Sequence, residues 1–320
     1  MKFFIVGGAG FIGSHFTDRL LADPSIKRVT LYDNFTSGRP WHYAHHEGDA
    51  RLRVVRADVK DLATLTASMA DHDAVIHLAS NPDIARAATE PDIDFREGTF
   101  LTQQVVEAMR ITGTPRLLYA SGSGVYGELG ELEVSEDYGP LLPISTYGAS
   151  KLAGEVLIAS YCFMFGITAR AFRFGNVVGA RQTHGVGFDF VRRLLDDPSR
   201  LRILGDGTQS KSYIHVEDVV DAVLLAHRRA GKPFDVYNVA TDYITVTEIA
   251  HLAMEVVGLD PNQVHLEYTG GDRGWKGDVP VVRLNTDRIQ SLGWHCHRTS
   301  RQALCISMRR MLDDMRAGKM

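Results

Sequence analysis

A glycine-rich segment near the start of the chain constrains the fold more than any other feature. Gly7, Gly10 and Gly13 follow an apolar run at residues 3–6 and precede apolar residues at helical spacing. Between a strand and a helix, the first glycine permits a tight turn, the second leaves room for a pyrophosphate, and the third lets the helix pack closely. The free N–H groups at the start of the helix attract phosphate oxygens. The segment therefore predicts a dinucleotide site.

An acidic residue follows the second predicted strand, which covers residues 28–32. Asp33 lies twenty residues after Gly13, where a carboxylate accepts hydrogen bonds from the adenosine ribose. The same carboxylate would repel a 2′-phosphate, so the predicted cofactor is NAD rather than NADP. The alternative is a glycine-rich turn followed by an ordinary surface aspartate.

Strand and helix patterns then alternate, which predicts an α/β fold built on a doubly wound parallel sheet. Apolar runs at residues 52–56, 74–78 and 116–120 give three more strands, and residues 168–174 and 234–239 extend the sheet. Ligands of such sheets bind beyond the carboxyl ends of the strands. We therefore expect the functional residues at that edge.

The length of 320 residues suggests two lobes. We expect a dinucleotide-binding domain over residues 1–174, with sheet segments that return near 213–240, and a smaller α/β substrate lobe over residues 175–320. The net charge of −4 gives no reason to expect nucleic acid or an anionic membrane as a partner. Three widely spaced cysteines indicate free thiols, and no apolar stretch is long enough to span a bilayer, so a cytoplasmic protein is expected.

Tyr147 and Lys151 are the candidate catalytic pair. Four residues apart on a helix, they share one face. A nearby ammonium favours the phenolate and lowers a phenol pKa that starts near ~10, so Tyr147 could act as a general base. The alternative is an exposed pair on an ordinary helix. The position of the pair, after the fifth strand and the glycine loop, favours the catalytic interpretation.

Together these segments resemble the extended short-chain dehydrogenase/reductase family. GGAGFIG, LYDN, ADV, HLAS, the serine loop before VYG, and YGASK carry the resemblance in the first half. RFGNVVGARQ, LGDGTQSKSYIHVEDVV and GGDRGWKGDVP carry it in the second half. Within the family the chain is similar to the nucleotide-sugar 4-epimerases. The resemblance implies a Rossmann-type domain that binds NAD, a UDP-sugar substrate, and a homodimer formed by helices at about 95–110 and 147–165.

The resemblance also implies residue roles. Tyr147 would be the base, and Lys151 would be its partner and hold the nicotinamide ribose. The family's catalytic hydroxyl falls on Gly122, so we expect a flanking serine, Ser123 rather than Ser121, to hold the sugar O4. The expected cofactor contacts are Gly7, Gly10, Phe11, Ile12, Gly13, Asp33, Asn34, Ser37, Gly38, Asp58, Val59, Leu78, Ala79, Ser80, Ser121, Tyr147, Lys151 and Phe174. The expected substrate contacts are Ser121, Ser123, Tyr147, Asn176, Arg181, Val186, Phe188, Arg192, Ile203, Lys211 and Arg273.

Three further positions depart from the family pattern. Phe95 stands where an asparagine is usual, so one cofactor contact is expected to be lost. Lys211 replaces an arginine and keeps the charge without the bidentate fork. Trp275 replaces another arginine, and Arg273 lies two residues before it.

The implied reaction is C4 epimerisation by transient oxidation to a 4-keto sugar. Dehydratases of the family carry Asp-Glu where this chain has Ser123 and Gly124, and uronate decarboxylases carry a glutamate at the second position. The absence of these acids leaves an epimerase or a 4-ketoreductase. A non-catalytic NAD-binding module is a further alternative, supported only by Gly122.

The identity of the sugar depends on two arginines. Arg181 and Arg192 lie in the segment expected to border the hexose, and a guanidinium matches the geometry of a C6 carboxylate. A diphosphate contact or a surface position is an equal alternative for either residue. Similar chains include UDP-glucuronate 4-epimerases, so UDP-glucuronate or UDP-galacturonate is favoured over UDP-glucose or UDP-galactose.

No metal is expected. His42, His45 and His46 lie close together in a polar segment, without a cysteine or carboxylate that frames them well, and a solvated loop explains them. His295 and His297 flank a cysteine but lack further ligands.

Overall fold

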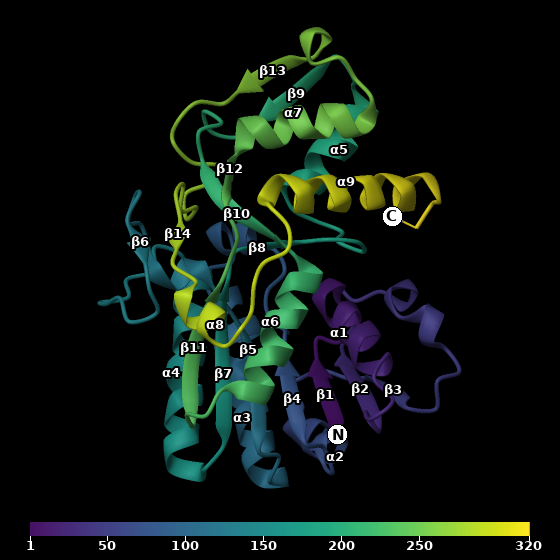
Figure 1. The fold of residues 1–320 in the computed structure, drawn as a ribbon, viewed down its shortest axis with the longest axis vertical. Coiled ribbons are helices and arrows are strands. Elements are labelled where there is room, and N and C mark those ends of the chain that lie inside the picture. The colour runs from purple at the N-terminus through teal and green to yellow at the C-terminus, as the bar shows by residue number, and fades with distance from the viewer. Residues whose placement is uncertain (320) are drawn as a thin grey trace.

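A parallel sheet of seven strands forms the larger lobe of the computed structural model, which describes residues 1–319 (Figure 1). From one edge to the other the strands are β11 (Phe234–Val239), β7 (Thr168–Phe174), β5 (Arg116–Gly122), β4 (Ala74–His77), β1 (Lys2–Val6), β2 (Arg28–Asp33) and β3 (Leu52–Arg56). The predicted doubly wound α/β fold is confirmed. The order reverses between β4 and β1, and sheets of this kind bind ligands beyond the carboxyl ends of the strands at that point.

Side chains of β1 alternate between the two faces of the sheet. Phe3 and Ile5 belong to the core on one face, and Phe4 and Val6 to the core on the other. All four are buried, as expected for a parallel sheet covered on both sides, and burying one such side chain contributes roughly 2 kcal/mol. Helices α1 (Phe11–Leu21) and α6 (Val216–Arg229) cover the first face, and α2 (Leu62–Met69), α3 (Phe100–Thr112) and α4 (Thr146–Phe165) cover the second.

Local contacts set the start and the end of α4, the helix that carries the predicted catalytic pair. The Ser145 hydroxyl caps it by accepting a hydrogen bond from the Gly148 N–H (3.1 Å), and Gly166 ends it with φ of 71°. A Cβ on Gly148 would lie 2.5 Å from the carbonyl oxygen of Gly124. The first turn of α4 therefore presses against the loop after β5, and this contact fixes Tyr147 relative to the sheet.

The smaller lobe lies beyond the carboxyl ends of the large sheet (top of Figure 1). Its helices pack around a core that includes Phe190, Ile249 and Leu304. The helices are α5 (Val186–Asp196), α7 (Val246–Val257) and α9 (Ser300–Arg316). Its strands are β8 (Asn176–Val178), β10 (Ser210–His215) and β12 (Tyr243–Thr245) in one mixed sheet, with β9 (Arg200–Ile203) and β13 (His265–Tyr268) as a parallel pair. A short parallel pair, β6 (Glu133–Val134) and β14 (Arg283–Leu284), links the lobes.

The chain passes between the lobes more often than its sequence indicated. In the region 213–240, β11 belongs to the large sheet and α6 covers one of its faces, whereas β10 pairs with β8 and β12 in the smaller lobe. Near the C-terminus, α8 (Asp287–Ser291) returns to the larger lobe, where Ile289 and Trp294 enter the same core as Phe3. Trp294 also donates its Nε1–H to the carbonyl oxygen of Asp218 (3.0 Å). Burial of these two large side chains explains the return.

Two predicted segments differ from the structure in detail. The predicted helix near 93–111 begins as one π-helical turn at Phe95–Thr99 before α3. The predicted loop after β2 contains two 3-10 turns, at Pro40–His42 and Ala44–His46. Among the helices of residues 1–319, none has the length and apolar character needed to cross a membrane.

Candidate active site

The glycine loop between β1 and α1 has the geometry that its sequence predicts. Gly7 adopts φ of +78°, and a Cβ there would lie 2.8 Å from the backbone nitrogen of Ala79, so only glycine fits. A Cβ on Gly13 would lie 2.6 Å from the carbonyl oxygen of Gly8, so this glycine lets α1 approach the loop itself. Gly10 is the N-cap residue of α1, and no side chain of the described residues caps this helix. The N–H groups of the first turn are therefore available to an anion.

Asp33 ends β2 and braces the glycine loop. Its carboxylate accepts hydrogen bonds from the N–H groups of Ala9 (3.0 Å) and Phe35 (2.7 Å). Burial raises the pKa of this carboxyl, and the two N–H donors act against that rise. Each oxygen keeps a lone pair for a ribose hydroxyl. The His42 ring holds the other side of the loop, because its Nδ1 donates to the carbonyl oxygen of Ala9 (2.8 Å).

The neighbouring strand ends bring other expected cofactor contacts to the same edge. Asn34, after β2, donates to the Asp58 carboxylate at the end of β3 (3.4 Å). The N–H groups of Leu78 and Ala79, after β4, donate to the carbonyl oxygen of Val6 (2.9 and 3.2 Å). A tight glycine turn, an uncapped helix start and a carboxylate at the end of β2 thus lie together. These groups fit NAD.

The predicted pairing of Tyr147 and Lys151 on one face of α4 is confirmed. The Lys151 ammonium lies 5.5 Å from the centre of the Tyr147 ring and donates to the carbonyl oxygen of Ala120 (2.8 Å). Burial lowers the pKa of Lys151 to about 8, opposed by the negative charges of Asp94 and Glu155. At neutral pH the lysine is therefore still mostly a cation.

The expected effect of this lysine on the tyrosine was wrong for this structure. The pKa of Tyr147 is raised, chiefly by burial and further by Asp94, while a hydrogen bond with Ser80 acts to lower it. The Lys151 ammonium faces the ring and the Ala120 carbonyl, and it is not among the groups that shift the pKa of the phenol. Burial therefore dominates the phenol here.

The serine loop separates the two candidate hydroxyls. Ser121, the penultimate residue of β5, is buried and donates its hydroxyl to Glu155 (2.5 Å), so this hydroxyl is already bonded within the protein. Glu155 is in turn bound by Arg173 through Nε (3.0 Å) and Nη2 (2.7 Å). Ser123 is half-buried at the start of a 3-10 turn, and it remains the candidate for the sugar O4. A Cβ on Gly122 would have no heavy atom of the described chain within 4 Å, so there is open space where the family hydroxyl is expected.

Two expected substrate cations are paired with carboxylates. Lys211, on β10, forms an ion pair with Asp278. Arg273 binds Glu128 (3.0 Å) and Asp272 (2.8 Å). Because Glu128 belongs to the loop that follows the serine turn, Arg273 connects the smaller lobe to the catalytic end of the larger one.

Residues 3–240 match the sequence model of the NAD dependent epimerase/dehydratase family. The chain belongs to this family. The resemblance inferred from the sequence is thereby confirmed, and so are the dependence on NAD and the status of an enzyme.

Both reactions of the family occur among the relatives. The chain is 33% identical over 304 residues to a UDP-glucose 4-epimerase of Mycolicibacterium smegmatis, covering 92% of this chain and 93% of the relative. It is 30% identical over 313 residues to a dTDP-glucose 4,6-dehydratase of Streptomyces griseus, covering 92% and 94%. Among solved structures, a UDP-galactose 4-epimerase has a TM-score of 0.86 at 35% identity, covering 98% of this chain and 100% of that one. A Streptomyces venezuelae dTDP-glucose 4,6-dehydratase with NAD bound has a TM-score of 0.90 at 26% identity, covering 99% and 98%.

The two arginines expected near the sugar have other partners in this family member. Arg181 forms an ion pair with Asp18 of α1 and donates to the carbonyl oxygen of His42 (3.1 Å). Its φ of 67° is strained for a non-glycine residue, and the ion pair offsets that cost. Arg192 is 57% exposed and lies over the Phe188 ring at 5.8 Å. The structure thus directs neither guanidinium to a sugar carboxylate.

Two expected contacts are buried in the cores. The Phe174 ring stacks on Phe172 with a centroid distance of 6.1 Å, within the core of the larger lobe. Ile203 has no exposed surface and lies in the core of the smaller lobe. Both side chains thus serve the packing of the cores, in line with the apolar patterns that contain them. Asn176 is exposed and Val186 is half-exposed, so both stay available.

Asp94 is a residue of the site that sequence reasoning missed. Its carboxylate is 2% exposed and accepts hydrogen bonds from Asn81 Nδ2 (2.8 Å) and Thr146 Oγ1 (2.7 Å). Its carbonyl oxygen accepts a hydrogen bond from Ser150 Oγ (2.8 Å). Asp94 falls inside the helix predicted near 93–111, so no local pattern distinguished it from an ordinary helical residue. The structure instead makes Asp94 the link between α4 and the loop after β4.

A carboxylate does lie beside the histidines of the loop after β2. The Nε2 atoms of His45 and His46 each lie 2.7 Å from one oxygen of Asp18. Sequence alone hid this contact because Asp18 lies on α1. Arg181 is paired with the other oxygen of the same carboxylate, so the cluster already contains its own cation.

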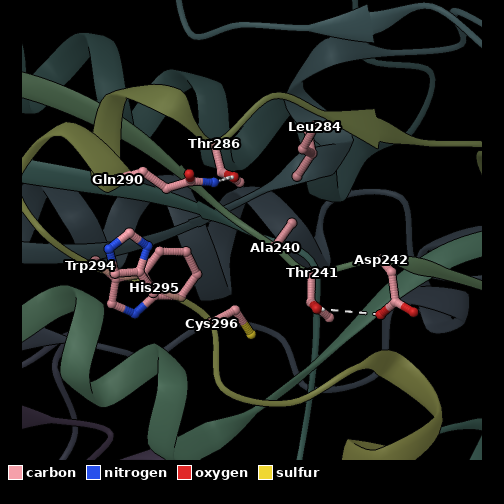
Figure 2. Close-up of a pocket in the computed structure, with 9 residues that line it drawn as sticks. All are labelled: Ala240, Thr241, Asp242, Leu284, Thr286, Gln290, Trp294, His295 and Cys296. Atoms are coloured by element: carbon pink, nitrogen blue, oxygen red, sulfur yellow. Dashed lines mark hydrogen bonds between the residues drawn. The ribbon is translucent and has the colours of Figure 1, made fainter.

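A cavity of about 340 Å³ lies apart from these residues, between the end of β11, β14 and α8 (Figure 2). Its polar lining is bonded internally, with Gln290 donating to Thr286 (2.7 Å) and Thr241 to Asp242 (3.3 Å). The wall formed by Trp294 and by the exposed His295 shares no residue with the predicted cofactor or catalytic sets.

Proposed function

We propose that the protein catalyses the NAD-dependent C4 epimerisation of a UDP-sugar through a 4-keto intermediate. The observation that carries the proposal is the pair Ser123 and Gly124 beside the first turn of α4. Dehydration to a 6-deoxy sugar needs an acid and a base to remove the C5 proton and expel the C6 hydroxyl. Serine and glycine supply neither, whereas epimerisation needs only the tyrosine and a hydride carrier.

The larger lobe would hold NAD, and the smaller lobe the nucleotide part of the substrate. Bound NAD would supply the hydride acceptor for sugar C4 and the hydride donor for the opposite face of the keto sugar. Tyr147 takes the proton of the C4 hydroxyl and later gives it back, with Ser80 as a hydrogen-bond partner. Lys151 would hold the nicotinamide ribose, as the family resemblance implies, and Ser123 would hold O4. Lys211 and Arg273 hold the diphosphate after exchanging their present carboxylate partners.

We propose a neutral hexose rather than a uronate as the sugar. The preference for a uronate depended on Arg181 or Arg192, but Arg181 is bound to Asp18 and Arg192 lies on Phe188 at the surface. If Lys211 and Arg273 grip only the diphosphate, the sugar ring can turn over between the two hydride transfers. We therefore propose UDP-glucose and UDP-galactose as the preferred pair.

The test is direct. Purified protein is incubated separately with UDP-glucose and UDP-glucuronate, without added cofactor, and the products are followed by NMR. We expect the C4 epimer of UDP-glucose, formed faster than that of the uronate. A 4-keto-6-deoxy product would establish a dehydratase, and net NADH consumption would establish a 4-ketoreductase. No conversion of either sugar with NAD present would overturn the proposal.

We also propose that two copies pair through the outer face of α3 and α4. Large apolar side chains are exposed there, including Phe163 (93%), Met164 (66%) and Val156 (63%) on α4, and Ile111 (50%) on α3. Val156 and Phe163 lie seven residues apart and so share a helix face. Sedimentation should give a dimer for the wild type and a monomer for Phe163→Asp. A wild-type monomer at micromolar concentration would exclude this arrangement.

A further inference from the structure

We infer that Asp94 is a positioning residue for the Tyr147–Lys151 pair and the counter-charge that keeps Lys151 a cation. This rests on the function proposed above for the pair. Asp94 lies outside α4, directly before the π-helical turn at Phe95–Thr99. It acts on the pair through the residues of α4 that neighbour the pair in sequence.

The contacts of Asp94 flank both members of the pair. Thr146, directly before Tyr147, donates to its carboxylate (2.7 Å), and Ser150, directly before Lys151, donates to its carbonyl oxygen (2.8 Å). Both donors lie on the first turns of α4. One residue thus anchors the helix at two points four residues apart, which restricts both rotation and sliding of the catalytic face.

Charge gives Asp94 its second role. A buried carboxylate is costly unless a cation compensates it, and Asp94 has no ion-pair partner within 4 Å among residues 1–319. Lys151 is also buried, and within residues 1–319 its ammonium contacts the Ala120 carbonyl oxygen and the rings of Tyr119 and Tyr147. Asp94 is the first of the charges that raise the pKa of Lys151 against the effect of burial. Because both groups are buried and Asp94 binds the two residues that flank the pair, the carboxylate would compensate the ammonium through space.

The other groups around Lys151 do not replace Asp94. Glu155, one turn further along α4, also acts on Lys151, but two hydrogen bonds from Arg173 already pair its charge. His77 on β4 is buried with its pKa lowered to about 3, so it is neutral. Tyr119 on β5 offers only its ring face, 5.3 Å from the ammonium.

The charge role is tested by a lysine titration that needs no enzymatic activity. The full chain is labelled with carbon-13 at lysine Cε, and the Lys151 signal is assigned by its absence in Lys151→Arg. We expect a midpoint near pH 8 in the wild type and one lower by roughly 1 unit in Asp94→Asn, because a facing charge is removed. Asp92→Asn is the matched control: it removes the same charge from an exposed residue paired with Arg96, and the midpoint should not move. Equal midpoints in the wild type and Asp94→Asn would overturn the proposed charge role.

The positioning role is tested with Thr146→Val, which keeps the charge of Asp94 and removes one anchor. We expect the lysine midpoint to stay in place while kcat falls about tenfold and KM changes little, because the tyrosine loses its orientation. This variant also tests the inference if Asp94→Asn does not fold. An unchanged kcat would refute the positioning role. If the wild type has no epimerase activity, the proposed function fails, but the titration still decides the charge role.

Discussion

Glu155 offers a sharp test of how the site is held together. Its carboxylate accepts three hydrogen bonds, two from Arg173 and one from Ser121, and the Arg173 and Glu155 side chains are each only 4% exposed. Glu155→Gln keeps the shape but leaves the guanidinium without a counter-charge in a buried site. Breaking a buried pair in this way costs roughly 3–5 kcal/mol. We therefore expect a loss of about 4 kcal/mol in the free energy of unfolding.

The assay is urea unfolding, followed by tryptophan fluorescence and by circular dichroism to check that the transitions coincide. Glu255→Gln is the control, since Glu255 pairs with Arg301 but both side chains are more than half exposed, and such a pair contributes about 0–1 kcal/mol. Replacing both partners, with Glu155→Leu and Arg173→Met together, should recover most of the loss because no charge stays unpaired. A loss below about 1 kcal/mol for Glu155→Gln would refute the reasoning.

Four further outcomes are expected. Tyr147→Phe should lower kcat by roughly 10²–10⁴-fold with unchanged thermal stability, and near-normal turnover would exclude the phenol as the base. Ser123→Ala should lower kcat, and adding Gly122→Ser should restore it, because a side chain at that position meets open space; no rescue in a folded double variant would argue against a hydroxyl at this place. Activity should decline as pH rises through about 8, where Lys151 loses its proton, whereas a flat profile to pH 10 would contradict its role as a cation. Gly7→Ala should destabilise the fold by roughly 1–3 kcal/mol in urea, since φ is +78° there, and an unchanged midpoint would show that the loop relaxes.

Local patterns predicted what depends on neighbours in sequence. The turn at Gly7, the carboxylate of Asp33 at the end of β2, and the shared face of Tyr147 and Lys151 all follow from spacing within one strand, loop or helix. The same holds for the alternation that gave the parallel sheet. These features need no knowledge of which segment lies beside which.

Contacts between distant segments could not be read in this way. Arg181 binds Asp18, which is 163 residues away in sequence, and Ser121 donates to Glu155, which is 34 residues away. Nothing near Arg181 or Ser121 in sequence therefore shows that its polar group already has a partner. Ser121 and Gly122 illustrate the limit. Neighbours on a strand point to opposite sides, and which side faces the ligand depends on packing against α4. The resemblance located the loop but did not set the direction of its side chains.

Because α4 is long, a small tilt of the helix produces a larger displacement at its far end. Tyr147 stands near one end of this unbroken 20-residue helix and Phe163 near the other. At 1.5 Å per residue, the two lie about 24 Å apart along the axis, so a tilt of about 5° at the outer end moves the phenol by roughly 2 Å. A displacement of that size is enough to uncouple proton transfer from hydride transfer. The anchors of the first turn, to Asp94 and to the loop after β5, therefore have to resist any tilt that a contact at the exposed aromatic end imposes.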